Sequence, residues 1–234
     1  MYSGWVPKCI FTSKIDIVLV KSIMINLLVV VVSCARNKKL WQQITDRDVP
    51  NLIILCGGAE ETKLEGNMLY LKCPDAYEGL SEKMVCAIEF IVKCEKFNEI
   101  THILKADDHD TTFTKQQIEN ISSKHGQFLN MNDYVGQKLI NCQGNRTYHY
   151  GKVSKGCIWD NKPYTGVFNP WLGGGETYIL SRRAMMCIYP QVDEVKHYGA
   201  LEDVMMANLL IKHGIRPVYL NYGIRTWVGK ISDA

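Results

Sequence analysis

The chain has 234 residues, of which 47% are hydrophobic and 22% charged, so it can bury the core of one large globular domain and is neither disordered nor fibrous. Its formal net charge is only +3 and its Lys and Arg residues are scattered, which argues against nucleic-acid binding by bulk electrostatics. The nine cysteines contain no C-x-x-C pair, so they indicate reduced thiols rather than a zinc site or a disulfide framework.

The first predicted element is a strand over residues 25–34, INLLVVVVSC. Such a continuous β-branched run is typical of a strand that is buried on both faces of a parallel sheet. Charged and polar residues interrupt the apolar stretch 15–32, so we expect no membrane span there and predict a soluble, cytoplasmic protein. Met24 stands directly before the strand, and residues 1–23 are interpreted as an N-terminal extension to a single domain, 24–234.

The next elements alternate between helices and strands. The patterns predict a helix over 37–48, strands over 51–58 and 67–74, a helix over 79–97 with Ser81 as its cap, and a strand over 99–106. This β-α-β-α-β order favours an α/β fold with an open, mostly parallel sheet and helices on both sides.

The second half of the chain has a different texture. Residues 126–172 are rich in Gly, Asn, Tyr and Trp and predict a smaller mixed lobe of short strands and loops. Regular structure returns over 175–188 and over 200–214, and the latter reads as an amphipathic helix. We therefore expect a nucleotide-binding half, 24–125, and an acceptor-binding and catalytic half, 126–234.

Four residues capable of binding a metal follow the strand over 99–106: Asp107, Asp108, His109 and Asp110. In open parallel sheets, ligands bind outside the carboxyl ends of the strands. Two carboxylates in a D-x-D pattern can hold a divalent cation that neutralises a diphosphate, although a solvated turn explains this segment alone equally well. His109 is expected to be a bystander, because adjacent strand residues point to opposite sides.

Two later segments are ambiguous when taken separately. Three consecutive glycines, 173–175, allow a close approach of the backbone to a ligand, or simply a tight turn. Glu202 and Asp203 begin the last predicted helix, where acidic side chains also complement the helix dipole.

Four segments in order carry a family resemblance: DAYEGLSEK (75–83), KADDHD (105–110), GGGETYILS (173–181) and LEDVMMANLLIKHGIRPV (201–218). Over about residues 25–225 the chain resembles the inverting GT-A glycosyltransferases of the β-1,3-galactosyltransferase and Fringe type, glycosyltransferase family 31. It departs from that pattern where His109 interrupts the family's three consecutive aspartates. The resemblance implies a Rossmann-like GT-A fold and transfer of a sugar from a UDP-sugar, with Mn²⁺ or Mg²⁺, to a hydroxyl of a glycan or glycoprotein acceptor.

The same resemblance implies roles for individual residues. Asp203 corresponds to the catalytic base, with neighbouring Glu202 as its rival, and Asp108 and Asp110 correspond to the metal ligands, Asp110 being the first choice. The donor pocket is implied to include Ser33, Cys34, Ala35, Arg36, Asp75, Lys83, Asp107, Asp108, Gly173, Gly174, Gly175 and Glu202. Lys83 has the alternative of being a charge on a helix surface.

Two other functional classes would explain part of this pattern. A nucleotidyltransferase acting on sugar phosphates shares the sheet and the carboxylates, but SCARNKKL (33–40) lacks the glycines of its phosphate loop. A carbohydrate-binding module explains Trp159, Tyr164, Trp171 and Trp227 as sugar platforms, yet it needs neither the acidic strand end nor Asp203.

Overall fold

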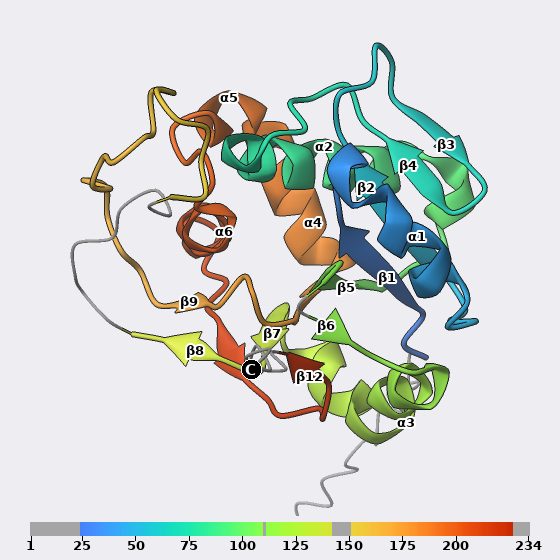
Figure 1. The fold of residues 1–234 in the computed structure, drawn as a ribbon. Coiled ribbons are helices and arrows are strands. Elements are labelled where there is room, and N and C mark those ends of the chain that lie inside the picture. Colours follow the sequence, from blue (N-terminus) through green and yellow to red (C-terminus); the bar gives the residue numbers. More distant parts are fainter. Residues whose placement is uncertain (1–23, 110, 142–150, 227–234) are drawn as a thin grey trace, which may run out of the picture.

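The computed structural model describes residues 24–109, 111–141 and 151–226 (Figure 1). The proposed extension 1–23 and the proposed ligand Asp110 lie outside the described residues. Among the described helices, none combines the length and the apolar character that crossing a bilayer requires.

Within the described residues, one eight-stranded sheet has the order β11-β7-β10-β5-β1-β2-β4-β3. Its strands are β1 (Leu27–Val32), β2 (Leu52–Cys56), β3 (Lys63–Glu65), β4 (Met68–Tyr70), β5 (His102–Asp107), β7 (Tyr134–Gly136), β10 (Tyr178–Ser181) and β11 (Val218–Tyr219). The β5-β1-β2-β4 block and the β11-β7 pair are parallel, whereas β10 is antiparallel to both of its neighbours and β3 to β4. The predicted mostly parallel α/β sheet is confirmed.

Two short pairs of strands lie outside this sheet. They join β6 (Thr111–Thr112) to β12 (Arg225–Thr226) and β8 (Leu139–Ile140) to β9 (Trp171–Leu172), both antiparallel. The first pair brings the end of the described chain next to the segment that follows β5, as Figure 1 shows.

Helices cover both faces of the sheet (Figure 1). They are α1 (Lys38–Thr45), α2 (Leu80–Lys93), α3 (Lys115–Met131), α4 (Arg182–Ile188), α5 (Val192–Val195) and α6 (Glu202–Ile211), with short 3-10 turns at Ala35–Asn37, Tyr77–Gly79, Glu95–Phe97 and Tyr189–Gln191. Alternate residues of β1 divide between two cores. Leu28 and Val30 pack with the residues of α2, α4 and α6, whereas Val29 and Val31 pack with those of α1 and α3.

Two local predictions were wrong. Ser81 does not cap the second long helix: Gly79 is the N-cap of α2, and Ser81 lies inside the helix with its hydroxyl buried and unpaired among the described residues. The last helix is not amphipathic, because α6 is enclosed by α2, α4 and β9, and every residue from 202 to 210 is buried. A helix that is surrounded by protein has no solvent face to mark with polar residues.

Candidate active site

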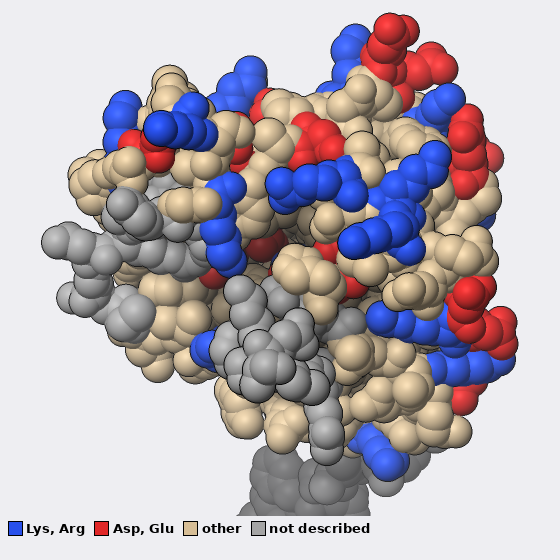
Figure 2. Space-filling view, viewed as in Figure 1, with Lys and Arg blue, Asp and Glu red and all other residues tan. Residues whose placement is uncertain are grey.

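One cavity of about 610 Å³ lies at the carboxyl ends of β1 and β5. Figure 2 shows it as a hollow with acidic side chains inside and Lys and Arg side chains on its rim. Of the residues predicted for the site, the cavity is lined by Ser33, Cys34, Arg36, Asp75, Lys83, Asp107, Asp108, Gly174, Gly175, Glu202 and Asp203. Ala35 and Gly173 are not among the lining residues. The volume is in the range of small-molecule sites.

Asp75 and Lys83 line one end of this cavity and form an ion pair there. Lys83 Nζ lies 2.8 Å from Asp75 Oδ1 and donates to the Ser33 carbonyl at 2.7 Å. The Asp75 carboxylate also accepts the backbone N–H groups of Ala35 and Gly57, each at 2.8 Å. The Lys83 side chain is only 3% exposed, so the alternative of a helix-surface charge is wrong. The pair holds the loops after β1 and β2 together.

Asp108 is bound by three donors. Its Oδ2 accepts Ser33 Oγ at 2.6 Å and Asn37 Nδ2 at 2.8 Å, and its Oδ1 lies 2.7 Å from His109 Nδ1. Burial by itself raises the pKa of Asp108, but these hydrogen bonds and the nearby imidazole outweigh burial and lower the pKa below its ordinary value. Asp108 is therefore kept ionised at neutral pH, and it organises the turn between β1 and α1.

A divalent cation fits this end of the cavity only with few protein ligands. Asp107 and His109 line the cavity beside Asp108, yet the described residues contain no group of three or more His, Cys, Asp and Glu side chains that could hold a metal. Mg²⁺ is commonly held by one or two carboxylates together with substrate phosphates and waters, and the strand end matches that donor set. The assignment of Asp108 and Asp110 as ligands stays a prediction.

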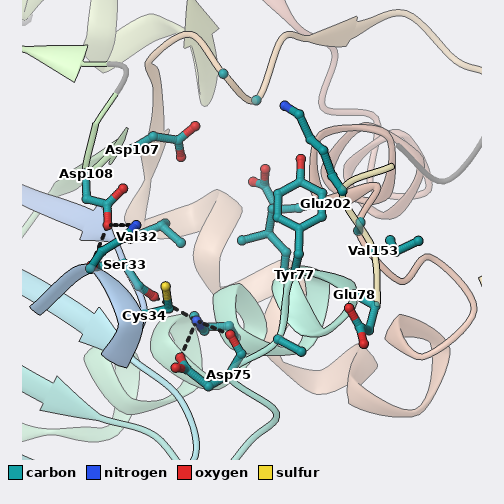
Figure 3. Close-up of a pocket in the computed structure, with 18 of the residues that line it drawn as sticks. Val32, Ser33, Cys34, Asp75, Tyr77, Glu78, Asp107, Asp108, Val153 and Glu202 are labelled. Atoms are coloured by element: carbon teal, nitrogen blue, oxygen red, sulfur yellow. Dashed lines mark hydrogen bonds and ion pairs between the residues drawn. The ribbon is translucent and has the colours of Figure 1, made fainter. Parts of the chain in front are cut away.

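Asp203 and Glu202 lie at the start of α6. Asp203 Oδ2 accepts the Gly174 N–H at 3.2 Å and Asp203 Oδ1 accepts the Val204 N–H at 2.9 Å. Figure 3 shows Glu202 across the cavity from Asp107 and Asp108. Glu202 is 1% exposed and accepts the Tyr178 hydroxyl. Burial raises the pKa of Glu202 to about 7, against the opposing effect of the Lys105 ammonium.

Sequence reasoning missed several lining residues. The cavity is also lined by Lys105 of β5, by Tyr77 and Glu78, and by Lys152, Val153 and Ser154. Figure 3 shows Tyr77, Glu78 and Val153 on the opposite side from Asp107 and Asp108. Lys152 Nζ lies 5.8 Å from the centre of the Tyr77 ring, and the Ser154 N–H donates to Glu78 at 3.3 Å. Of these residues, only Lys105 could have been predicted from the sequence, because side chains alternate along a strand and Lys105 therefore lies on the same face as Asp107.

The aromatic residues considered as sugar platforms serve mainly in packing. Trp171 and Tyr164 are buried in the core shared with α2, α4 and α6. Trp159 packs against Gly199, and Trp227 lies outside the described residues.

Comparisons with known proteins concern the family and the fold of the chain. Residues 46–221 match the family described as Galactosyltransferase. No curated protein matches the chain. Among solved structures, the chain is similar to 2-C-methyl-D-erythritol 4-phosphate cytidylyltransferase from Thermus thermophilus, with 10% identity, 82% of this chain and 87% of that chain covered, and a TM-score of 0.41. It is also similar to 4-diphosphocytidyl-2C-methyl-D-erythritol synthase from Anaerococcus prevotii, with 9% identity, 89% and 94% covered, and a TM-score of 0.42. Neither of these likenesses carries a functional argument.

Proposed function

The chain belongs to the galactosyltransferase family and is a glycosyltransferase, and we propose that it moves a sugar from UDP to a glycan hydroxyl with inversion and with the help of Mn²⁺ or Mg²⁺. The observation that carries this proposal is that Asp203 lines the same cavity as the acidic end of β5. One cavity thus offers a base for the acceptor and a site for the diphosphate.

Asp203 is the proposed general base. Its carboxylate takes the proton from an acceptor hydroxyl while that oxygen forms a bond to the anomeric carbon, and the bond from that carbon to the phosphate oxygen breaks. UDP leaves with the bonding electrons. The Gly174 and Val204 N–H groups hold the two carboxylate oxygens and fix the direction from which the proton is taken. Glu202 is a weaker candidate for the base, because its carboxylate is buried against Tyr178.

The proposed diphosphate site is at the end of β5. A bound divalent cation would neutralise the charge that develops on the leaving UDP. Its proposed ligands are Asp108, which lines the cavity, and Asp110. Arg36 and Lys152 line the same cavity and supply further positive charge. The nucleoside would then lie against Ser33 and Cys34, where Asp75, Lys83 and Asp108 brace the loop.

Calorimetry with UDP tests the donor and the metal. We expect UDP to bind with Mn²⁺ present and to lose that binding when a chelator is added, because the carboxylates at the end of β5 repel a bare diphosphate. Equal affinity in both conditions would refute the metal dependence. Nuclear magnetic resonance of the product made from an α-linked UDP-sugar tests inversion, for which a β-linked product is expected.

The family membership favours transfer over the two alternative classes. A sugar-phosphate nucleotidyltransferase would release pyrophosphate from a nucleoside triphosphate, so a pyrophosphate assay with UTP and a sugar phosphate separates it from the proposal. A binding module would hold a glycan without turning over any UDP-sugar.

A further inference from the structure

A buried lysine connects the two sides of the cavity. Lys105 is 1% exposed, and its Nζ lies 2.6 Å from Asp107 Oδ1 and 3.9 Å from Glu202 Oε2. The same ammonium donates to the Gly174 carbonyl and lies 5.8 Å from the centre of the Tyr178 ring. The Lys105 ammonium therefore contacts the end of β5 on one side and, on the other, the loop at Gly174 and the start of α6.

The Gly174 residue extends this connection to Asp203. Its carbonyl accepts the Lys105 ammonium, while its N–H donates to Asp203 Oδ2 at 3.2 Å. A Cβ at position 174 would lie 2.9 Å from Glu202 Oε2 and 3.2 Å from Asp203 Cβ. A side chain at position 174 would therefore require the acids to shift away from the backbone, which the glycine avoids.

The ammonium stays charged in its buried position. Burial by itself lowers the pKa of Lys105, but the carboxylates of Asp107 and Glu202 outweigh burial and raise the pKa above its ordinary value. A buried cation held by several acceptors has a fixed position, because moving it leaves a desolvated charge without partners. We therefore expect the Lys105 ammonium to keep a fixed position between Asp107 and the start of α6.

We propose that Lys105 is a positioning residue for the transfer reaction: it binds Asp107 directly and, through the Gly174 backbone, fixes the carboxylate of Asp203 relative to the donor. This inference rests on the proposed function, since it takes Asp203 as the base. Misplacing a reacting group by about 1 Å costs about 10²-fold in rate, so a residue that touches no substrate can still control turnover.

The rival explanation is that Lys105 only offsets the charge of buried Glu202. A cycle of variants separates the two: the parent, Lys105→Met, Glu202→Gln and the double variant Lys105→Met with Glu202→Gln. Each is measured for its melting temperature, for UDP affinity with Mn²⁺, and for kcat and KM of UDP-galactose hydrolysis. Lys93→Met is the matched control, because Lys93 is an exposed lysine that pairs with Glu89 outside the cavity.

If Lys105 positions Asp203, the double variant melts close to Glu202→Gln, and its kcat is at least tenfold lower than that of Glu202→Gln. If the double variant turns over as fast as Glu202→Gln, Lys105 is only a charge partner and the proposal fails. The Lys93→Met control is expected to match the parent in all measurements.

Gly174→Ala keeps the proposal testable if the lysine variants do not fold. The added methyl group would crowd Glu202 and Asp203 and so disturb the contact of the loop with Asp203, without removing any charge. We expect kcat to fall at least tenfold while the dissociation constant for UDP with Mn²⁺ changes by less than about threefold, and an unchanged kcat overturns the inference. The proposed function fails separately, if the parent itself neither binds UDP with Mn²⁺ nor hydrolyses any of a panel of nucleotide-sugars.

Discussion

The Lys83 ammonium lies 2.8 Å from the Asp75 carboxylate, and this pair holds the loop after β1 against α2. Asp75 also accepts the N–H of Ala35, which lies in that loop. The floor of this end of the cavity is thus built from a charge pair between residues that flank the 3-10 turn Tyr77–Gly79.

Removing one member of this pair is expected to destabilise the protein. Lys83→Met leaves Asp75 without its cation and should lower the free energy of unfolding by about 3 kcal/mol, measured by urea denaturation. Lys93→Met removes an exposed ion pair and is expected to change the free energy of unfolding far less, because solvent screens such a pair. Similar losses for both variants would show that the buried pair does not support the loop.

The Asp203→Asn variant tests whether Asp203 acts as the base or as a contact to the donor. Asn keeps the shape of the side chain but cannot take a proton, so transfer should fall by about 10²–10⁴-fold while affinity for UDP with Mn²⁺ stays near the parent's. Steady-state kinetics and calorimetry measure the two effects. A loss of both would place Asp203 among the donor contacts. An active Asp203→Asn beside an inactive Glu202→Gln would move the base to Glu202.

The strand-end acids are tested by removing them one at a time. Asp110→Ala is expected to abolish metal-dependent binding of UDP without lowering the melting temperature. Asp108→Ala is expected to lower the melting temperature as well, because Ser33 and Asn37 lose their shared acceptor. If Asp108→Ala melts like the parent and binds UDP normally, the turn after β1 does not depend on this carboxylate.

Glu202 predicts a pH dependence of stability. Its pKa is raised from an ordinary value of 4.5 to about 7, so the folded state binds this proton more tightly than the unfolded state does. The resulting stabilisation is complete below about pH 4.5 and is lost as the pH rises through about 7. The Glu202→Gln variant has no carboxyl group to titrate at this position, so it is expected not to show this loss of stability. Urea denaturation at pH 5 and pH 8 should show a larger decrease for the parent, and parallel decreases would contradict the assignment.

Much of the sheet could be predicted because its signals are local. The β-branched run of β1 is one continuous segment, and Asp107 and Asp108 lie together at the end of β5. The rule that ligands bind at the carboxyl ends of parallel strands then predicts a site at the ends of both strands. The cavity confirms that Ser33, Asp107 and Asp203 lie around one space. Their chemical roles stay predictions.

The remaining features depend on partners distant in the sequence. No local pattern shows that β10 lies antiparallel between β5 and β7, or that Gly174 contacts both Lys105 and Asp203. The predictions for Ser81 and for an amphipathic α6 failed for the same reason. Each was read from composition along the chain, whereas the packing of α2 and the enclosure of α6 decide the outcome.

The pairing of β10 with β5 has a consequence for how the protein folds. Tyr178 lies opposite Lys105 in that pairing, so the lysine meets its partners from the second half only after most of the chain has been made. Contacts between such distant segments slow folding, because a long loop must close before they form. A chain that ends before residue 178 lacks β10 and Glu202, so Lys105 loses the contact with Glu202 and keeps the one with Asp107. We therefore expect slow refolding and no folded state for the first half alone.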